Sequence, residues 1–516
     1  MKPDEIIIKE IMESGVKTQE SLARLKRKIA KKYKISCLAN FSLLKTYHEM
    51  VKNKRVRAAK DIERVLITRP VRSLSGIVNV SVLTKEYPCP GKCLYCPIES
   101  GIPKSYVSGE PAVERAKKLK YDPYLQVQKR IEMLQEQGHP TDKIELRIVG
   151  GTWSYYPKKY QDWFIKKCFD ACNKKTSLNL KKAQKINEKA KHRIIGLSIE
   201  TRPDFINQKE IERLRELGAT LVEMGVQSIY DDVLKKNVRE HGAKEIVSAT
   251  KLLKDAGFKV LYQMMPNLPG SDLKKDEKMF KELFSDPDFK PDLLKIYPCA
   301  LLKSAPLYKL WLKGKYKPYS EKQLINLVRK IKKLIPHYVR IQRISRDIPS
   351  NLIVSGPAKI SNLRQILADD MKKNKWRCHC IRCREVKGDY NSKGKIILFR
   401  ENYKASNGQE IFLTFENKDR TKLYSLLRLR LTSDKKSLIR ELHTYGSLRP
   451  ISKEQFSAAS PQHKGLGKRL VKEAEKIAKK EFHSKKIAVI AGVGVRSYFR
   501  KAGYRLENTY MAKALR

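Results

Sequence analysis

The sequence is poor in acidic residues. Its 55 Asp and Glu stand against 110 Lys and Arg, which gives a formal net charge of +55 over 516 residues. Such an excess of one sign repels itself in a compact state. A generally lysine-rich composition would account for the charge. So would a polyanionic partner, because each neutralised phosphate releases a counterion. We favour the polyanionic partner because the motifs described below agree with it.

Long apolar runs, internal repeats and low-complexity tracts are also missing. No run approaches the ~20 apolar residues that a membrane-spanning helix needs. The acidic, amphipathic start of the chain, MKPDEIIIKEIMES, lacks the apolar region of a signal peptide. A hydrophobic fraction of 41% argues against a chain that is disordered throughout. We therefore expect a cytoplasmic protein without membrane segments, built from about three domains.

Cysteine is sparse, and most of it is clustered. Six of the 10 cysteines lie in PCPGKCLYCP, residues 88–97, and RCHCIRCRE, residues 377–385. In a long chain without a secretion signal, such clusters indicate metal binding rather than a disulfide framework.

Four regions follow one another along the chain. Residues 1–75 are predicted to be basic and helical. The run SLARLKRKIAKKYKI places Leu22, Leu25, Ile29 and Tyr33 on one helical face. A solvated surface helix and an arm that binds nucleic acid both fit this pattern.

Residues 76–360 alternate β-rich apolar runs with helical segments. This alternation predicts an α/β domain with a parallel sheet, open or closed as a barrel. Chemistry in such sheets lies at the carboxyl ends of the strands. The first cysteine cluster follows the first predicted strand, GIVNVSVLT, so we expect it at that end.

Residues 361–395 form a polar connector, and residues 396–516 change pattern again. KIILFREN, EIFLTFEN, KLYSLLRLRL and SLIRELHTYGS are predicted strands of an antiparallel kind. A helix begins within QHKGLGKRLVKEAEKIAKKEF, and the short buried strand IAVIAGVG follows it. This order predicts a smaller α+β domain.

Three closely spaced thiolates indicate an iron–sulfur site. A cubane cluster has four irons, so Cys89, Cys93 and Cys96 leave one iron free for another ligand. A structural zinc site takes four ligands, so a zinc site completed by a distant residue is the alternative. The C-x3-C-x2-C spacing after the first strand of an α/β domain resembles the radical S-adenosylmethionine enzymes.

That resemblance implies a partial TIM-like (β/α) barrel and a 4Fe–4S cluster on these three cysteines. The open iron would bind S-adenosylmethionine, and reductive cleavage would give a 5′-deoxyadenosyl radical. The resemblance also implies cofactor contacts from the ends of further strands, at Gly150, Gly151, Thr152, Glu200, Arg202 and Gln227.

A glycine-rich motif opens the last long helix. Backbone N–H groups at such a helix start bind a pyrophosphate, although an ordinary capped helix is the alternative. The flanking strands, LIRELHTYG and IAVIAGVG, give an order that resembles the acetyl-CoA-binding core of the GNAT acetyltransferases. This resemblance implies acetyl-CoA contacts from Gln462, Gly465, Leu466, Gly467 and Lys468, and from Glu441, Leu442, His443 and Thr444 beside the pantetheine arm.

Many GNAT enzymes place a tyrosine near the segment YFRKAGY as the general acid for the departing CoA thiolate. The aligned position here holds Phe499, which can contact the cofactor but cannot donate a proton. Tyr498, beside that position, and Tyr504 are the candidates for the acid, unless none is needed.

The second cysteine cluster offers Cys378, Cys380 and Cys383 as zinc ligands. A tetrahedral zinc needs four donors. His379 lies between two cysteines, and we prefer Cys299, after the strand DLLKIYP, as the fourth ligand. A set of free buried thiols is the alternative.

The two cofactor motifs together resemble the Elp3 family, the catalytic subunits of Elongator and their stand-alone archaeal and bacterial relatives. Matching stretches include KYDPYLQVQKRIEMLQEQGH, ETRPD, RELHTYGS and QHKGLG. The resemblance implies conversion of the tRNA wobble uridine, at position 34, to 5-carboxymethyluridine. The radical would activate the methyl group of acetyl-CoA, which ordinary bases leave untouched at neutral pH.

By the same resemblance, Lys143 contacts acetyl-CoA from the radical domain and takes part in catalysis. The implied partner is the anticodon stem-loop of tRNA, and a homodimer or an Elongator-like assembly follows by analogy only. Two rival readings are a protein lysine acetyltransferase with a structural cluster and a non-catalytic tRNA-binding scaffold.

Overall fold

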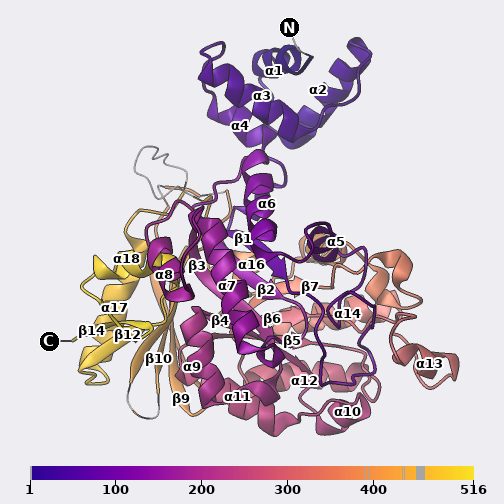
Figure 1. Cartoon of the computed structure of the whole chain (residues 1–516), viewed down its shortest axis with the longest axis vertical. Helices are drawn as coiled ribbons and strands as arrows, with labels where there is room; N and C mark the ends of the chain where they lie inside the picture. Colours follow the sequence, from indigo (N-terminus) through magenta and orange to yellow (C-terminus); the bar gives the residue numbers. More distant parts are fainter. Residues whose placement is uncertain are drawn as a thin grey trace.

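The computed structural model describes residues 3–515, apart from residues 389, 393, 433, 435 and 449–459. Figure 1 shows a small helical lobe at the N-terminus, a central domain of strands and helices, and a second sheet at its side. Within the described residues, no helix is both long and apolar enough to cross a membrane.

The N-terminal lobe consists of four helices with their own apolar core. Leu22 and Ile29 are buried in it and Leu25 packs against it, as the helical pattern predicts. Tyr33 does not share that face: it follows the last turn of α2, is 39% exposed, and donates its hydroxyl hydrogen to Glu10. The helices are α1 (Pro3–Glu13), α2 (Gln19–Lys32), α3 (Asn40–Lys52) and α4 (Lys60–Leu66).

The central domain is a parallel sheet of seven strands in sequence order. Each strand pairs with the next, and among the described residues no pairing joins β1 to β7, so the barrel is open on one side. The strands are β1 (Val78–Leu83), β2 (Lys143–Val149), β3 (Arg193–Thr201), β4 (Leu221–Gln227), β5 (Lys259–Met264), β6 (Leu293–Ile296) and β7 (Arg340–Ile344).

Helices cover the outside of this sheet because its outward side chains are apolar. In β2 the side chains alternate, with Ile144, Leu146 and Ile148 buried and the residues between them only half-buried. The helices between β1 and the C-terminal domain are α5 (Pro111–Lys118), α6 (Pro123–Glu136), α7 (Lys158–Asn173), α8 (Leu180–Asn187), α9 (Gln208–Leu217), α10 (Asp231–Lys236), α11 (Ala243–Asp255), α12 (Leu273–Ser285), α13 (Leu307–Leu312), α14 (Glu321–Leu334), α15 (Leu363–Lys373) and α16 (Ile381–Arg384).

The C-terminal domain is a mixed sheet with the strand order β13-β14-β12-β11-β10-β9-β8. Helix α17 packs on it through an apolar face that begins at Leu466, as the helical spacing predicts. The elements are β8 (Ile397–Ala405), β9 (Gly408–Glu416), β10 (Leu423–Leu431), β11 (Ser437–Thr444), α17 (Leu466–Lys480), β12 (Lys486–Val489), α18 (Arg496–Arg500), β13 (Arg505–Glu507) and β14 (Tyr510–Ala514).

A buried ion network joins the two sheets. Asp292, directly before β6, accepts hydrogen bonds from Arg440 of β11, and Arg428 of β10 lies 3.5 Å from the same carboxylate. Arg430 pairs with Asp255 at 2.6 Å. These central-domain residues lie at or near the amino ends of the strands, so the C-terminal domain docks opposite the end where the first cysteine cluster lies.

Candidate active site

A cavity of about 850 Å³ opens at the carboxyl ends of the central strands. The loop after β1 brings the first cysteine cluster to it, and the ends of β2, β3 and β4 bring the polar residues that the sequence predicts. The predicted residues that line it are Cys89, Cys93, Cys96, Gly151, Thr152, Glu200, Arg202 and Gln227. The sheet therefore gathers these residues as expected for strand ends.

Gly150 lies just behind this wall. Its φ is +121°, in the region that favours glycine, and its carbonyl accepts a hydrogen bond from Thr84 Oγ1 at 3.1 Å. A Cβ at Gly150 would collide with that same hydroxyl. A glycine is needed here for the chain to turn from β2 towards the cavity.

The geometry of the first cysteine cluster suits a polynuclear centre better than a single ion. Thiolates on one zinc lie about 4 Å apart. The Sγ atoms of the second cluster, Cys378, Cys380 and Cys383, all lie within 4.8 Å of one another. Those of the first cluster, Cys89, Cys93 and Cys96, do not. Each thiolate of a cubane binds a different iron, which requires the wider spacing.

Arg239 was not predicted, yet it faces this cluster. Its Nη1 donates to Cys93 Sγ at 3.4 Å, and its Nη2 donates to the Gly225 carbonyl. A guanidinium beside a thiolate stabilises the negative charge that iron ligation requires. Nothing in the stretch NVREHGA marks this arginine apart from its position after β4.

Several buried polar atoms in the cavity wall have no partner among the described residues, and two of them belong to residues that the sequence predicts. Arg202 uses Nε and Nη2 for Asp204 and Glu240, but its Nη1 is unpaired. Gln227, whose φ is +69°, leaves its Oε1 unpaired. One free donor and one free acceptor suit a ligand that carries both a carboxylate and an amine, as S-adenosylmethionine does. The residues present therefore fit both the cluster and its cofactor.

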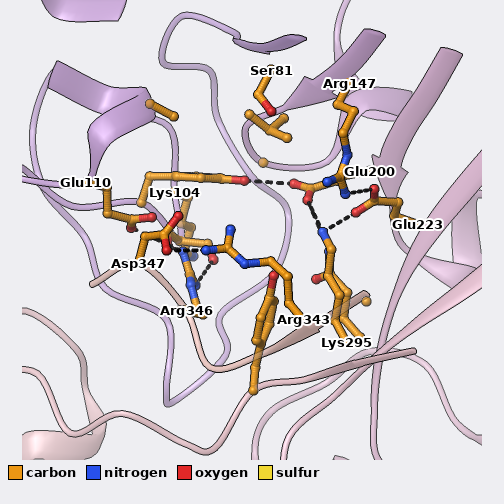
Figure 2. A pocket seen from close by; sticks show the side chains of 18 of the residues that line it. Ser81, Lys104, Glu110, Arg147, Glu200, Glu223, Lys295, Arg343, Arg346 and Asp347 are labelled. Atoms are coloured by element: carbon orange, nitrogen blue, oxygen red, sulfur yellow. Dashed lines mark hydrogen bonds and ion pairs between the residues drawn. The ribbon is translucent and has the colours of Figure 1, made fainter. Parts of the chain in front are cut away.

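Ionised side chains fill the inner part of the cavity, as Figure 2 shows. Lys295 lies 3.2 Å from Glu200 and also pairs with Glu223, which pairs in turn with Arg147. Burial acts to raise the pKa of Glu223, but Arg147 and Lys295 hold it well below its usual range. The sequence signal was available: Glu223 and Lys295 interrupt the apolar strands LVEMGVQ and LLKI.

The second predicted site lies at the other end of β2. Lys143, the first residue of β2, donates from Nζ to Gln462 Oε1 at 3.0 Å and lies 3.3 Å from His463 Nε2. Gln462 Nε2 donates to the Thr444 carbonyl at 2.9 Å and to the Gly76 carbonyl at 3.2 Å. Burial lowers the pKa of Lys143 to about 8.

Strands β11 and β12 separate beside this motif. They are parallel and pair only from Ser437 to Ile439. Past that point Leu442, His443 and Thr444 still pair with β10, and on the β12 side no strand pairs with them among the described residues. Gly465, at φ +81°, begins α17 at this opening, with Lys468 exposed in its first turn. A split between parallel strands next to a helix start can take an extended ligand with a pyrophosphate.

The structure separates the two tyrosine candidates. A Cβ built on Gly467 would lie 3.2 Å from Tyr498 Oη, so this hydroxyl faces the first turn of α17. Tyr504 instead donates to Glu475 Oε1 at 2.8 Å, and Phe499 packs between the two rings.

Two residues of the predicted strand contact are otherwise engaged through their side chains. Glu441 accepts from Arg428 Nε at 2.8 Å, and His443 Nε2 lies 2.8 Å from the Ser75 carbonyl. Their backbone groups remain the relevant part of the prediction.

The second cysteine cluster forms one compact group, but without Cys299. The Sγ atoms of Cys378, Cys380 and Cys383 lie within 4.8 Å of one another. The prediction that Cys299 joins them is wrong in this structure, because Cys299 lies beyond the carboxyl end of β6, in a separate apolar cluster with Tyr316. The three thiols lie at the amino end of β7, where Ile381 N–H donates to the Val339 carbonyl. The His379 ring contacts His337.

Comparison with known proteins identifies the class first. Residues 88–283 match the family model of the radical SAM superfamily, and residues 291–373 match that of the radical SAM C-terminal domain. This superfamily implies a 4Fe–4S cluster and S-adenosylmethionine.

Whole-chain relatives are more specific. The chain is 45% identical over 533 residues to a tRNA uridine(34) acetyltransferase of Methanocaldococcus infernus, covering 99% of this chain and 98% of the relative. It is 38% identical over 539 residues to Elongator complex protein 3 of Homo sapiens, covering 99% and 96%. The chain therefore belongs to the family of tRNA uridine(34) acetyltransferases and Elongator complex protein 3.

A solved structure agrees with the fold. The archaeal Methanocaldococcus infernus Elp3 with an N-terminal deletion (1–46) is similar at a TM-score of 0.75 and 45% identity. The match covers 86% of this chain and 100% of that one.

Proposed function

We propose that this protein modifies the wobble uridine of tRNA, forming 5-carboxymethyluridine from acetyl-CoA by a radical reaction. The names of its relatives support the substrate, since several are tRNA uridine(34) acetyltransferases. The net charge of +55 supports a nucleic-acid substrate. The two sites described above support the use of two cofactors.

One observation carries the proposal. Lys143 belongs to the radical domain, and its ammonium contacts Gln462 and His463 of the glycine-rich motif. A structural cluster on an ordinary acetyltransferase would need no such contact. The contact ties the acetyl-CoA motif to the same strand, β2, that ends at the cluster cavity.

At the cluster end, Cys89, Cys93 and Cys96 would hold the iron–sulfur cluster. Arg202 Nη1 and Gln227 Oε1, both unpaired, would hold the carboxylate and amine of S-adenosylmethionine. When bound, the cluster and S-adenosylmethionine would supply a radical that abstracts hydrogen from the methyl group of acetyl-CoA, which no side chain could deprotonate. The glycine turn at Gly150 and Gly151 lets the backbone approach the ligand.

At the other end, the first turn of α17 would bind the pyrophosphate of CoA through its backbone N–H groups. The backbone of residues 441–444 would pair with the pantetheine arm in the gap between β11 and β12. Tyr498 would donate the proton that the CoA thiolate needs on release. Burial raises the pKa of Tyr498, which keeps its proton in place at neutral pH. Lys143 would hold the acyl end of the ligand.

The two ends are far apart on the scale of a chemical bond. β2 runs from Lys143 to Val149, a rise of about 20 Å at 3.3 Å per residue. Binding of acetyl-CoA and cleavage of S-adenosylmethionine should therefore be separable by mutation. The acetyl group or the nucleobase has to move along the barrel during the reaction.

Three further assignments belong to the same proposal. Cys378, Cys380 and Cys383 would bind zinc. The anticodon stem-loop would be the part of tRNA that is recognised. A cytoplasmic location and a homodimer are carried over from the family resemblance, and light scattering tests the homodimer.

The test uses anaerobically reconstituted enzyme with S-adenosylmethionine, dithionite, bulk tRNA and acetyl-CoA labelled on its methyl carbon. We expect labelled 5-carboxymethyluridine in digested tRNA by mass spectrometry, and none with Cys93→Ala. Label in protein lysines, with unlabelled tRNA and no effect of Cys93→Ala, would establish a lysine acetyltransferase instead. Label in neither product, with RNA binding intact, would leave only a binding scaffold.

A further inference from the structure

Four arginines meet at the outer part of the cavity without any acidic partner. Arg69 and Arg72 come from the segment between α4 and β1, Arg115 from α5 and Arg130 from α6. All four line the cavity that also holds the cysteine cluster. None of them forms an ion pair within the described part of the chain.

Their neighbours confirm that this charge is uncompensated. Burial, together with repulsion from Arg72, Arg115 and Arg69, lowers the pKa of Arg130 to about 10. Burial and Arg72 likewise lower the pKa of Arg115. Arg115 donates from Nη2 to the Ser81 carbonyl at 3.1 Å, but its Nε is buried with no partner in the described structure.

Three other arginines of the same cavity do have acidic partners. Arg147 pairs with Glu223, Arg343 with Asp347, and Arg346 with Glu110 (Figure 2). Glu114, the acidic residue next to Arg115, instead accepts a hydrogen bond from the Gly109 N–H at 2.7 Å. Arg72, Arg115 and Arg130 are half-buried, whereas Arg69 is exposed. Half-buried charges are costly unless they are paired, so a cluster without a carboxylate indicates that its counterion comes from outside the chain.

The position of the cluster identifies the chemical class of that counterion. Arg115 contacts Ser81 of β1, one edge of the open barrel, while Arg343 of β7, the other edge, lines the same cavity. A base that enters this cavity must leave its sugar–phosphate backbone at the opening. Guanidinium groups match phosphate oxygens in bidentate geometry.

We propose that Arg69, Arg72, Arg115 and Arg130 form a site for one or two backbone phosphates of the RNA whose uridine enters the cavity. The proposal rests on the proposed function for the identity of the RNA. The site fixes the position of the loop while the base reaches inward. It is distinct from the start of α17, where backbone amides would bind the phosphates of CoA.

The experiment measures binding of a fluorescent anticodon stem-loop RNA to the reconstituted enzyme over a series of KCl concentrations. Arg115→Gln and Arg130→Gln should each weaken binding about fivefold and reduce the slope of log Kd against log salt by about 1. Arg505→Gln removes the same charge from an exposed position on β13 and should change neither quantity. The thermal midpoint of Arg130→Gln should not fall, because this variant removes a charge that has no acidic partner.

A second arm locates the contact. Methylphosphonate linkages, which carry no charge, are placed one at a time in the loop. At one or two positions neutralisation should weaken wild-type binding and leave Arg130→Gln unaffected. Slopes equal to that of Arg505→Gln would overturn the proposal. So would a loss of acetyl-CoA affinity in place of RNA affinity, since the arginines would then serve CoA.

These outcomes are independent of the catalytic test. If labelled acetyl-CoA gives no modified tRNA while the arginine variants still lose RNA affinity, the proposed function fails and the phosphate site stands. If modification proceeds and the variants bind RNA as wild type does, the phosphate site alone fails.

Discussion

Lys143 is the residue on which the acetyl-CoA proposal depends most directly. Burial lowers its pKa to about 8, so its ammonium loses the proton within an accessible pH range. We expect the affinity for acetyl-CoA to fall as the pH rises past about 8, because a neutral amine is a weaker hydrogen-bond donor to the acyl carbonyl than an ammonium is. Lys143→Arg stays charged and should bind with no such fall. Isothermal titration over this range checks the prediction.

The control is the cofactor at the other end of β2. Binding of S-adenosylmethionine should not change in Lys143→Arg or Lys143→Gln, because the cavity residues do not contact Lys143. A fall in acetyl-CoA affinity that is the same in wild type and Lys143→Arg would show that another group titrates.

Among single residues, the spacing of motifs along the sequence predicted those site residues that belong to a local pattern. The sequence located Cys89, Cys93 and Cys96, and the strand-end residues Arg202 and Gln227, which line one cavity. It missed Arg239, because a contact across 146 positions leaves no local pattern. It misplaced Cys299, because the connector with the other three cysteines returns after α15 to the amino end of β7, which local spacing does not show.

At the scale of elements, the loop that carries Cys378, Cys380 and Cys383 offers a direct test of zinc binding. It ends in α16, where the Ile381 N–H donates to the Val339 carbonyl just before β7 and Arg384 donates to the His337 carbonyl. Cys380→Ser should reduce bound zinc from about one per chain to near zero and lower the thermal midpoint. Plasma mass spectrometry and calorimetry measure both.

Cys37→Ser is the matched control, since Cys37 is exposed and lies outside the cluster. It should leave zinc content and the thermal midpoint unchanged. Purified wild-type protein free of zinc, with a midpoint equal to that of Cys380→Ser, would refute the zinc site.

Helices and strands were predictable where the spacing of apolar residues agrees with a helix-terminating residue such as glycine. α9 ends at Leu217, before Gly218 at φ +91°, as the glycine in its sequence predicts. The apolar face of α17 was readable from its helical spacing. The separation of β11 from β12 could not be predicted, because residues 440–444 look like an ordinary continuation of the strand. Only the partner strand decides where pairing stops.

At the scale of the whole molecule, two domains meet through buried charges as well as through apolar contacts, since buried apolar residues of both domains form one continuous cluster. Arg440 and Asp292 lie 148 positions apart and form a buried pair. Each looks like an ordinary surface charge in the sequence, so docking could not be predicted from composition. The pairing helps to hold the glycine-rich motif against β2.

Glu441 gives the measurable consequence of this network. Burial acts to raise its pKa, but Lys259 and Arg428 lower it to about 2. A carboxyl with a depressed folded-state pKa adds stability above its unfolded value, near 4.3, and loses it as the pH falls towards 2. Glu441→Gln leaves Arg428 and Lys259 without this partner and should cost about 3 kcal/mol near neutral pH. Denaturant unfolding should show the difference in unfolding free energy between variant and wild type closing below about pH 4.

Glu507→Gln is the control: it breaks an exposed pair with Lys486 and should cost at most about 1 kcal/mol at any pH. A gap for Glu441→Gln that stays constant from neutral to acid pH would show that its cost comes from packing and not from the charge.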